Sequence, residues 1–144
     1  FIHYEISNFA RPGFEGRHNL SYWQSSPYLA LGTAASGWLP PKRYSNPASL
    51  DEYYRLIDAG ELMPGAETLS NEQSEADEIM MGLRLLEGID LKDFETRHLR
   101  PFEWGREREL ERLIRLELLE REDGRIRLSE RALFISNAVI GELL

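Results

Sequence analysis

The ten residues from 119 to 128 constrain the fold more than any other stretch of the chain. Two short segments with strand-like patterns, 119–122 and 125–128, flank the pair Asp123-Gly124. An Asp-Gly pair between two such segments is the strongest short-range signal for a β-hairpin. Helical patterns lie on both sides of this hairpin, so the sequence predicts a small winged-helix-like lobe.

The second half of the chain begins with two helical patterns. Ser70 and Gln73 have the spacing of a capping box at the start of the first, and Gly88 is predicted to stop it. Asp90 is the predicted N-cap of a second, shorter helix that runs through Phe94. The predicted buried stripe of the first helix consists of Ala76, Ile79, Met80 and Leu83.

A longer helix is predicted after Pro101, because apolar residues recur there at helical spacing. Beyond the hairpin, Ser129 is the predicted N-cap of a last helix that reaches Leu144. The predicted buried face of the longer helix consists of Leu110, Leu113, Ile114 and Leu118.

The first half of the chain alternates short strand patterns with loops. Residues 2–6 alternate apolar and polar side chains, as a half-buried strand does. Residues 8–19 contain Arg-Pro-Gly and Glu-Gly, which mark a loop. The apolar run 27–31 predicts a short buried strand that leads into a loop of small residues, 32–37.

A helix is predicted to follow this loop. Asn46 has the position of an N-cap, and Pro47 has that of the first helical residue. Gly60 then ends the pattern. The apolar residues that recur at helical spacing are Leu50, Tyr53, Tyr54 and Ile57.

Composition divides the chain near residue 64. Residues 1–64 contain six acidic and five basic residues, whereas 65–144 contain 19 acidic and 12 basic residues. All six tyrosines and two of the three tryptophans lie before residue 64. We therefore expect two domains, a near-neutral binding region over 1–64 and a charged helical lobe over 65–144.

The formal net charge of −8 and the absence of cysteine exclude several classes of function. An acidic chain is a poor partner for nucleic acid. Without cysteine the chain holds no disulfide, no thiolate zinc site, no cysteine nucleophile and no cysteine-ligated iron–sulfur cluster. Because Phe1 opens directly into a strand pattern, we expect the chain to be a piece of a longer protein.

The densest group of chemically capable side chains lies between residues 17 and 23. His18, Asn19, Tyr22 and Trp23 bring together an imidazole, an amide and two amphipathic aromatic rings. Histidine is the commonest side-chain metal ligand, including to haem iron, and aromatic rings can stack on a flat macrocycle. The alternative is that His18 hydrogen-bonds the loop while Tyr22 and Trp23 pack in the core.

The loop 32–37 permits close approach of a ligand to the backbone, because it contains no side chain larger than that of threonine. It lacks the lysine of a P-loop and the spacing of a dinucleotide fingerprint. The alternative is a tight bend between a strand and a loop. Arg43 could reach a ligand carboxylate. His3 and His98 have no partner at metal-ligand spacing and are predicted to be structural or solvated.

Several segments spread over the whole chain carry a resemblance to one known family. In the first half they are Tyr4-Glu5-Ile6-Ser7-Asn8-Phe9-Ala10, His18-Asn19-Leu20-Ser21-Tyr22-Trp23, Gly32-Thr33-Ala34-Ala35-Ser36 and Arg43-Tyr44-Ser45-Asn46. In the second half they are Met81-Gly82-Leu83-Arg84-Leu85, Gly88-Ile89-Asp90 and Ile135-Ser136-Asn137-Ala138. In this order they resemble the radical S-adenosylmethionine (SAM) proteins of the HemW type, haem chaperones related to oxygen-independent coproporphyrinogen III oxidase.

The resemblance implies an α/β fold. Residues 1–45 would be the last strands of a partial (β/α) barrel, and 65–144 would be an appended helical domain of the HemN type. The parent protein would bind SAM and a [4Fe–4S] cluster whose cysteines lie outside this chain. We therefore expect no radical chemistry from this chain alone. Glu117 and Ala132 stand at positions where the family pattern has glycine.

Two sets of site residues are carried over by the resemblance, and neither set is catalytic or ligates a resident metal. The residues implied to bind haem are His18, Asn19, Tyr22 and Trp23. Those implied to contact SAM are Gly32, Ala34, Ala35 and Ser36.

The implied function is that of a cytoplasmic chaperone that binds haem and passes it to haem-accepting proteins. Membrane-associated respiratory proteins and a second copy of the chain are further expected partners, and nucleic acid is not. One alternative is a genuine coproporphyrinogen III oxidase of porphyrin biosynthesis. Another is a non-catalytic winged-helix interaction module. Acidic residues on its helix argue against contact with DNA phosphates, so protein contact is the expected use: Glu107, Glu109, Glu111 and Glu117.

Overall fold

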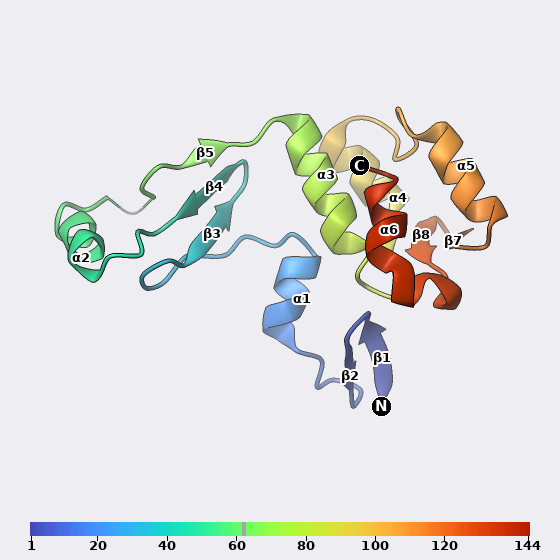
Figure 1. Ribbon diagram of the computed structural model, residues 1–144, viewed down its shortest axis with the longest axis horizontal. Coiled ribbons are helices and arrows are strands. Elements are labelled where there is room, and N and C mark those ends of the chain that lie inside the picture. The colour runs from blue at the N-terminus through green and yellow to red at the C-terminus, as the bar shows by residue number, and fades with distance from the viewer. Residues whose placement is uncertain (62) are drawn as a thin grey trace. The chain divides into compact units, whose positions relative to one another are not determined.

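The structure is a computed structural model that describes residues 1–61 and 63–144. Helices and three small antiparallel sheets make up the chain (Figure 1). It divides into two compact units, one that joins Phe1–Ser25 to Glu75–Leu144 and one formed by Ser26–Ser74. The mixed α/β class predicted from the sequence is confirmed.

The second half of the chain builds the predicted winged-helix-like lobe. Strand β8 lies between β6 and β7 in one antiparallel sheet, with Leu119 opposite Leu128. Asp123 and Gly124 have φ angles of 51° and 75°, which the tightest hairpin turns require. In chain order the elements are α3 (Asn71–Gly82), β6 (Ile89–Asp90), α4 (Leu91–His98), α5 (Glu107–Arg115), β7 (Leu119–Glu122) and β8 (Arg125–Leu128).

The core of this lobe is apolar and draws on its helices and its sheet. The Phe94 and Phe102 rings meet edge to face, with 5.1 Å between their centroids. The predicted face of α5 is buried at Leu110 and Leu113. The remaining buried residues of the core are Ile79, Leu83, Ile89, Leu119, Ile126, Leu128, Ala132, Val139, Ile140 and Leu143.

Helix α3 starts as predicted, but its buried face includes two carboxylates that the apolar pattern does not predict. The Ser70 amide donates to Gln73 Oε1 (2.9 Å), and the Gln73 amide donates to Ser70 Oγ (3.2 Å), which completes the capping box. The helix ends at Gly82 and not at Gly88, and Met80 is 38% exposed. The residues that it buries are Glu75, Glu78, Ile79 and Gly82. The predicted stripe is confirmed at Ile79 and Leu83, which are fully buried, and is wrong at Met80. The two carboxylates are buried beside it because arginines outside α3 pair with them.

Helix α4 has the predicted N-cap. The Asp90 carboxylate accepts hydrogen bonds from the backbone amides of Lys92 and Asp93, both at 3.0 Å. The helix continues past Phe94 to His98, so it is longer than predicted.

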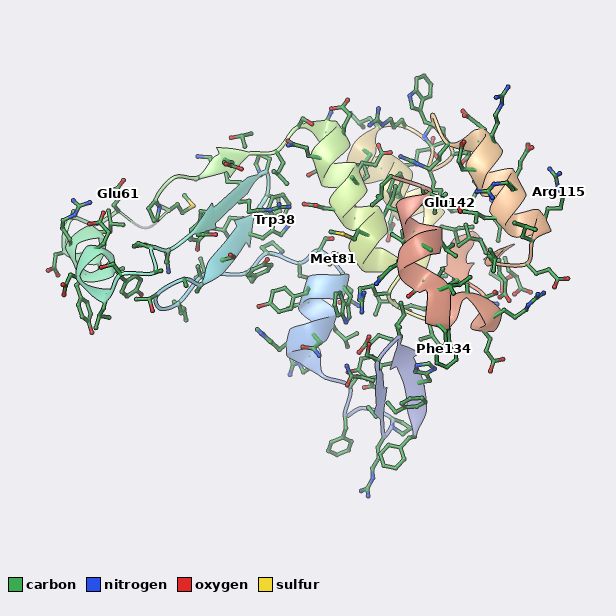
Figure 2. The ribbon with its side chains drawn as sticks, viewed as in Figure 1. Trp38, Glu61, Met81, Arg115, Phe134 and Glu142 are labelled. Atoms are coloured by element: carbon green, nitrogen blue, oxygen red, sulfur yellow. The ribbon has the colours of Figure 1, made fainter. Side chains whose placement is uncertain are left out.

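The predicted helix from Ser129 to Leu144 is wrong. A 3₁₀ helix, η1 (Glu130–Ile135), comes first, and a short α-helix, α6 (Ser136–Gly141), follows it. Ser129 does not cap either one, because its hydroxyl donates to the Glu117 carbonyl at 2.6 Å. Phe134, in η1, is fully exposed (Figure 2).

Residues 1–25 form a hairpin and a short helix. β1 (Ile2–Glu5) pairs with β2 (Asn8–Ala10), and α1 (Arg17–Trp23) follows. The prediction of a loop over 8–19 is therefore wrong at β2 and at the start of α1. The turn after β1 is fixed because the fully buried Glu5 carboxylate accepts hydrogen bonds from the Ser7 amide (3.0 Å) and the Asn8 side chain.

The unit 26–74 contains β3 (Ser36–Leu39), β4 (Lys42–Ser45), β5 (Glu67–Thr68) and helix α2 (Leu50–Asp58). The three strands form one antiparallel sheet with β4 in the middle. The prediction of a strand over 27–31 is wrong, because in the described chain this run makes only a single bridge, from Tyr28 to Trp38.

The start of α2 also differs from the prediction. Its N-cap is Ser49, whose hydroxyl accepts the Glu52 amide at 3.4 Å, and Asn46 lies before the helix. The Glu61 amide donates to the Leu56 carbonyl and closes the helix beyond Gly60, as predicted.

The domain boundary near residue 64 stays a prediction. The two compact units of the structure divide the chain at other places, after Ser25 and after Ser74. Residues 1–25 group with the lobe through backbone pairing. The Ile6 amide donates to the Arg84 carbonyl (3.0 Å), and the Leu86 amide donates to the Tyr4 carbonyl (3.2 Å). No described helix is long and apolar enough to span a membrane.

Candidate functional site

Helix α1 carries the four residues predicted to bind haem. Residues four apart lie above one another on a helix, so His18 lies next to Tyr22 and Asn19 lies next to Trp23. His18 and Asn19 are exposed, whereas Tyr22 and Trp23 are half-buried. The helix therefore anchors itself through its aromatic residues and presents the imidazole and the amide to solvent.

The His18 imidazole is available to an external ligand. Its ring meets the Tyr22 ring edge-on, with 4.8 Å between centroids and an interplanar angle of 77°. Within the described part of the chain, neither imidazole nitrogen has a hydrogen-bond partner, and the Ser21 hydroxyl binds the His18 carbonyl instead. The predicted alternative, in which His18 hydrogen-bonds the loop, does not describe this arrangement.

Trp23 is held from the side of the lobe. The Arg84 guanidinium lies over the indole ring, 4.7 Å from its centroid. Sequence reasoning missed this pair, since the two residues are far apart in the chain. The segment Met81–Leu85, which includes Arg84, contributes to the family resemblance, but the resemblance implies no role for this arginine.

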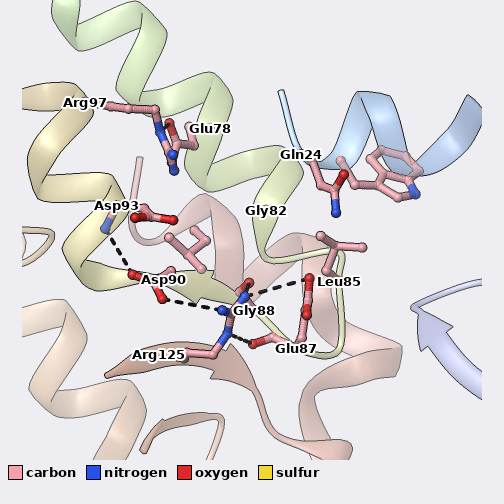
Figure 3. Close-up of a pocket in the computed structure, with 12 residues that line it drawn as sticks. Gln24, Glu78, Gly82, Leu85, Glu87, Gly88, Asp90, Asp93, Arg97 and Arg125 are labelled. Atoms are coloured by element: carbon pink, nitrogen blue, oxygen red, sulfur yellow. Dashed lines mark hydrogen bonds and ion pairs between the residues drawn. The ribbon is translucent and has the colours of Figure 1, made fainter. Parts of the chain in front are cut away.

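A cavity of about 290 Å³ lies beside Trp23 and Gln24 (Figure 3). Arg97 forms a two-pronged pair with Glu78 at 2.5–3.2 Å, and Arg125 donates to the Gly88 carbonyl at 2.9 Å. Most of the charges that line the cavity thus pair with one another, Arg97 with Glu78 and Arg125 with Glu87 and Asp90, and Asp93 adds a further carboxylate. The arrangement stabilises the lobe and gives no reason to place a ligand there.

Two groups at this cavity have shifted pKa values. The hydrogen bond from the Asp93 amide lowers the pKa of Asp90 below its ordinary value, and the charge of Arg125 contributes less. The hydrogen bond to Glu78 raises the pKa of Arg97. Both shifts favour the charged forms of these side chains.

The other two histidines have structural surroundings, in agreement with their predicted role. His98 Nε2 lies 2.9 Å from Glu78 Oε2, and its ring packs 4.5 Å from that of Phe94. His3 Nε2 lies 3.2 Å from the Ile6 carbonyl oxygen. Sequence reasoning missed the Glu78 partner of His98, but the acids at every third position of a core-facing helix, Glu72, Glu75 and Glu78, are a signal that could have found it.

The residues predicted to contact SAM lie in a loop that the unit 26–74 clamps tightly. Asn46 is 8% exposed, and its Nδ2 donates to the carbonyls of Gly32 (2.8 Å) and Ala30 (3.2 Å). The Gly32 amide donates to the Tyr53 hydroxyl (3.2 Å), and the Ala34 amide donates to the Pro47 carbonyl (3.0 Å). Protein groups therefore occupy much of the hydrogen-bonding capacity of this backbone.

The end of the same loop depends on Gly37. A Cβ atom at this position would lie 2.3 Å from Cζ of the Tyr44 ring, a contact that no side chain tolerates. Tyr44 is 3% exposed, and its hydroxyl accepts the Ala30 amide at 3.0 Å. Ser36 and Ser45 share a hydrogen bond across β3 and β4 at 2.9 Å. SAM contact by Gly32, Ala34, Ala35 and Ser36 stays a prediction.

The chain does not fit an iron–sulfur cluster, since it contains no cysteine. Among the described residues, no three His, Asp or Glu side chains gather in a way that could hold a metal ion. A single exposed imidazole, by contrast, is enough to supply an axial ligand to haem iron.

Comparisons with known proteins identify the family. Residues 69–135 match the model of the HemN C-terminal domain. The heme chaperone HemW of Lactococcus lactis is 32% identical over 144 residues, which are 100% of this chain and 38% of the relative. The chain belongs to the HemW family. The HemW of Bacillus subtilis is 30% identical over 143 residues, 98% of this chain and 38% of the relative.

A solved structure shares the fold of this HemW-family chain. It is coproporphyrinogen III oxidase (HemN) from Escherichia coli, a radical SAM enzyme, with a TM-score of 0.66 and 16% sequence identity. The match covers 97% of this chain and 37% of that one. At this identity the likeness concerns the fold alone. The chain spans less than two fifths of the HemW relatives described above.

Proposed function

We propose that this chain is the haem-binding part of a HemW-type haem chaperone. The observation that carries the proposal is the exposed His18 imidazole on α1, beside the half-buried Tyr22 ring. Haem is the cargo of such a protein. His18 would supply the axial ligand to iron, and Tyr22 and Trp23 would border the macrocycle. Asn19, one position further along the exposed side of the helix, would contact the same ligand.

Haem titration of the 144-residue chain tests this proposal. We expect a shift of the Soret band on addition of ferric haem, and we expect His18→Ala to weaken it. His3→Ala is the matched control, because that imidazole faces a backbone carbonyl and stacks on Phe9 at 4.1 Å. An identical Soret shift in both variants and in the unaltered chain would overturn the assignment of His18.

The parent protein would use SAM and a [4Fe–4S] cluster, which supply radical chemistry when bound. This chain would contribute the Gly32–Ser36 backbone to the SAM pocket and no cluster ligand. We expect the isolated chain to show no SAM cleavage after iron–sulfur reconstitution. Cleavage by the isolated chain would contradict this division of roles. Conversion of coproporphyrinogen III by the full-length protein would favour the oxidase instead.

The partner of the lobe is proposed to be protein and not nucleic acid. Arginines of β8 and of η1 already pair with carboxylates. Arg127 pairs with Glu120 (2.8 Å) and Glu122 (2.9 Å), and Arg131 pairs with Glu117. Few positive charges are therefore left for phosphates. Transfer of haem to acceptor proteins, association with respiratory membrane proteins, self-association and a cytoplasmic location are parts of the same proposal.

A further inference from the structure

Arg84 differs from the other arginines of the lobe. Most of those pair with carboxylates, as Arg97, Arg100, Arg106, Arg125 and Arg127 do. Arg84 has no carboxylate partner among the described residues, although the chain has an excess of acids. Its side chain is half-buried, and its Nε atom is buried without a hydrogen bond. A partly desolvated cation without a counter-charge calls for an explanation.

Trp23 also has a buried donor without a hydrogen-bond partner. Its indole Nε1 is buried and has no hydrogen-bond partner in the described chain. The described residues contain two such side-chain donors, Trp23 Nε1 and Arg84 Nε, and they belong to residues that stack on each other. Buried donors are nearly always paired in folded proteins. What the pair lacks is therefore an acceptor, and an anionic one suits the guanidinium.

The backbone fixes this pair from both sides. Residues 84–86 run antiparallel to β1, where the Arg84 carbonyl and the Leu86 amide are both hydrogen-bonded and Leu85 bridges Glu5. Trp23 is the last residue of α1, whose amides are held in helical hydrogen bonds. A charged group held on rigid backbone loses little freedom when it binds, so the geometry favours a preformed site.

We propose that the Trp23–Arg84 pair binds a carboxylate of the tetrapyrrole, namely a haem propionate. This inference rests on the proposed haem binding by His18. The planar guanidinium matches a carboxylate in a two-pronged geometry that a lysine does not reproduce. His18 and Trp23 are five residues apart, which separates them by about 7.5 Å along the helix axis and by about 140° around it, so a haem that meets both would wrap the flank of α1. That distance is on the scale that separates the centre of a porphyrin from its carboxylate rim.

The acidic cavity beside Trp23 does not compete for this role. Its described lining contains Arg97 and Arg125, which are both already paired with carboxylates, and it does not include Arg84. A propionate in that cavity would face four acidic side chains. Among the described residues near α1, Arg84 is therefore the base that has both a fixed position and no carboxylate partner.

The test compares ferric haem with haem dimethyl ester, in which both propionates are esterified. Both probes are titrated into the 144-residue chain and followed at the Soret band. We expect Arg84→Gln to weaken binding of haem about tenfold and to leave binding of the ester unchanged. Arg108→Gln, which removes an exposed arginine of α5, is the matched control and should alter neither affinity.

The outcomes separate this inference from the function on which it rests. Equal weakening of haem and ester by Arg84→Gln would mean that Arg84 only supports the Trp23 ring, and it would overturn the propionate contact. Unchanged binding of both probes would overturn it as well and would point to an acidic protein segment as the missing partner. Binding of neither probe by the unaltered chain would refute haem binding itself. Should Arg84→Gln change the far-ultraviolet circular dichroism, Arg84→Lys carries the same test, with an intermediate loss for haem alone.

Discussion

The lobe of residues 75–144 and the unit of residues 26–74 hold their backbones in place by different means. The lobe buries a continuous apolar core, with Phe94, Leu113 and Ile126 each at 0% exposure. The unit 26–74 has few buried apolar side chains and instead ties its loop with Asn46 and the hydroxyls of two tyrosines. The difference teaches that a loop can be held in one conformation without a large apolar core, provided that its backbone polar groups have hydrogen-bond partners.

The buried carboxylates of α3 complicate this contrast and give its strongest test. Glu75 is 2% exposed and pairs with Arg100 and Arg106, so removal of its carboxylate takes a buried counter-charge from both arginines. We expect Glu75→Ala to lower the free energy of unfolding by about 3 kcal/mol. Urea denaturation followed by circular dichroism measures the change. Glu87→Ala, at an exposed acid 3.8 Å from Arg125, should cost less than about 1 kcal/mol. Equal costs would show that the α3 pairs are not structural.

Removal of the Asn46 side chain tests how the unit 26–74 holds its loop. Asn46→Ala leaves the carbonyls of Ala30 and Gly32 without their donor and should cost about 1–3 kcal/mol locally. Amide hydrogen exchange should speed up at Ala34 and stay unchanged in α5. Asn137→Ala, at an exposed residue of α6, is the control. Faster exchange throughout the lobe would abolish the distinction between the two regions.

The left-handed residue after α5 tests whether the lobe carries avoidable strain. Glu117 has a φ of 57°, a region that favours glycine, and the family resemblance predicted glycine there. We expect Glu117→Gly to stabilise the lobe by about 0.5–1 kcal/mol, because the exposed pair with Arg131 contributes little. Arg115→Gly, within α5, should destabilise by a similar amount. Thermal unfolding of both variants shows whether each substitution raises or lowers the stability. Destabilisation by Glu117→Gly would refute the claim that the backbone at Glu117 is strained.

The smallest expected effect concerns the pH dependence of the α4 cap. Because the Asp93 amide lowers the pKa of Asp90, the charged cap stabilises the lobe above the unfolded-state pKa of about 3.9, and this stability is lost as pH falls through the lower folded-state pKa. Asp90→Asn keeps a capping side chain without the titration. Unfolding of both proteins between pH 7 and pH 2.5 should show their stability difference shrinking only at the acidic end. A stability difference that does not change with pH would show that the negative charge of Asp90 does not stabilise the lobe.

The parts of the fold that the sequence predicted are those fixed by local chemistry. The Asp123-Gly124 turn, the Ser70–Gln73 capping box and the Asp90 cap all depend on residues within a few positions of one another. Residue types alone single out the cluster on α1, and the family resemblance adds its implied role in haem binding.

The errors have a common cause in contacts between distant segments. The buried face of α3 includes Glu78 because Arg97 pairs with its carboxylate and His98 Nε2 lies within hydrogen-bond distance of it, which no periodicity of apolar residues can reveal. The position before Pro47 predicts Asn46 as a cap, whereas its side chain binds the carbonyls of Ala30 and Gly32, which lie well before it in the chain. Trp23 and Arg84 meet only because β1 pairs with the segment after α3.

The paired arginines of β8 and η1 have a kinetic consequence. Since Arg127 and Arg131 are already matched to acids, the long-range field of the lobe is set by its surplus carboxylates. A protein with a basic face would be steered toward such a surface and would meet it faster than diffusion without attraction allows. Added salt would slow that encounter while leaving the lifetime of the complex nearly unchanged. A basic partner of the lobe would therefore be favoured before contact, by the rate at which it arrives.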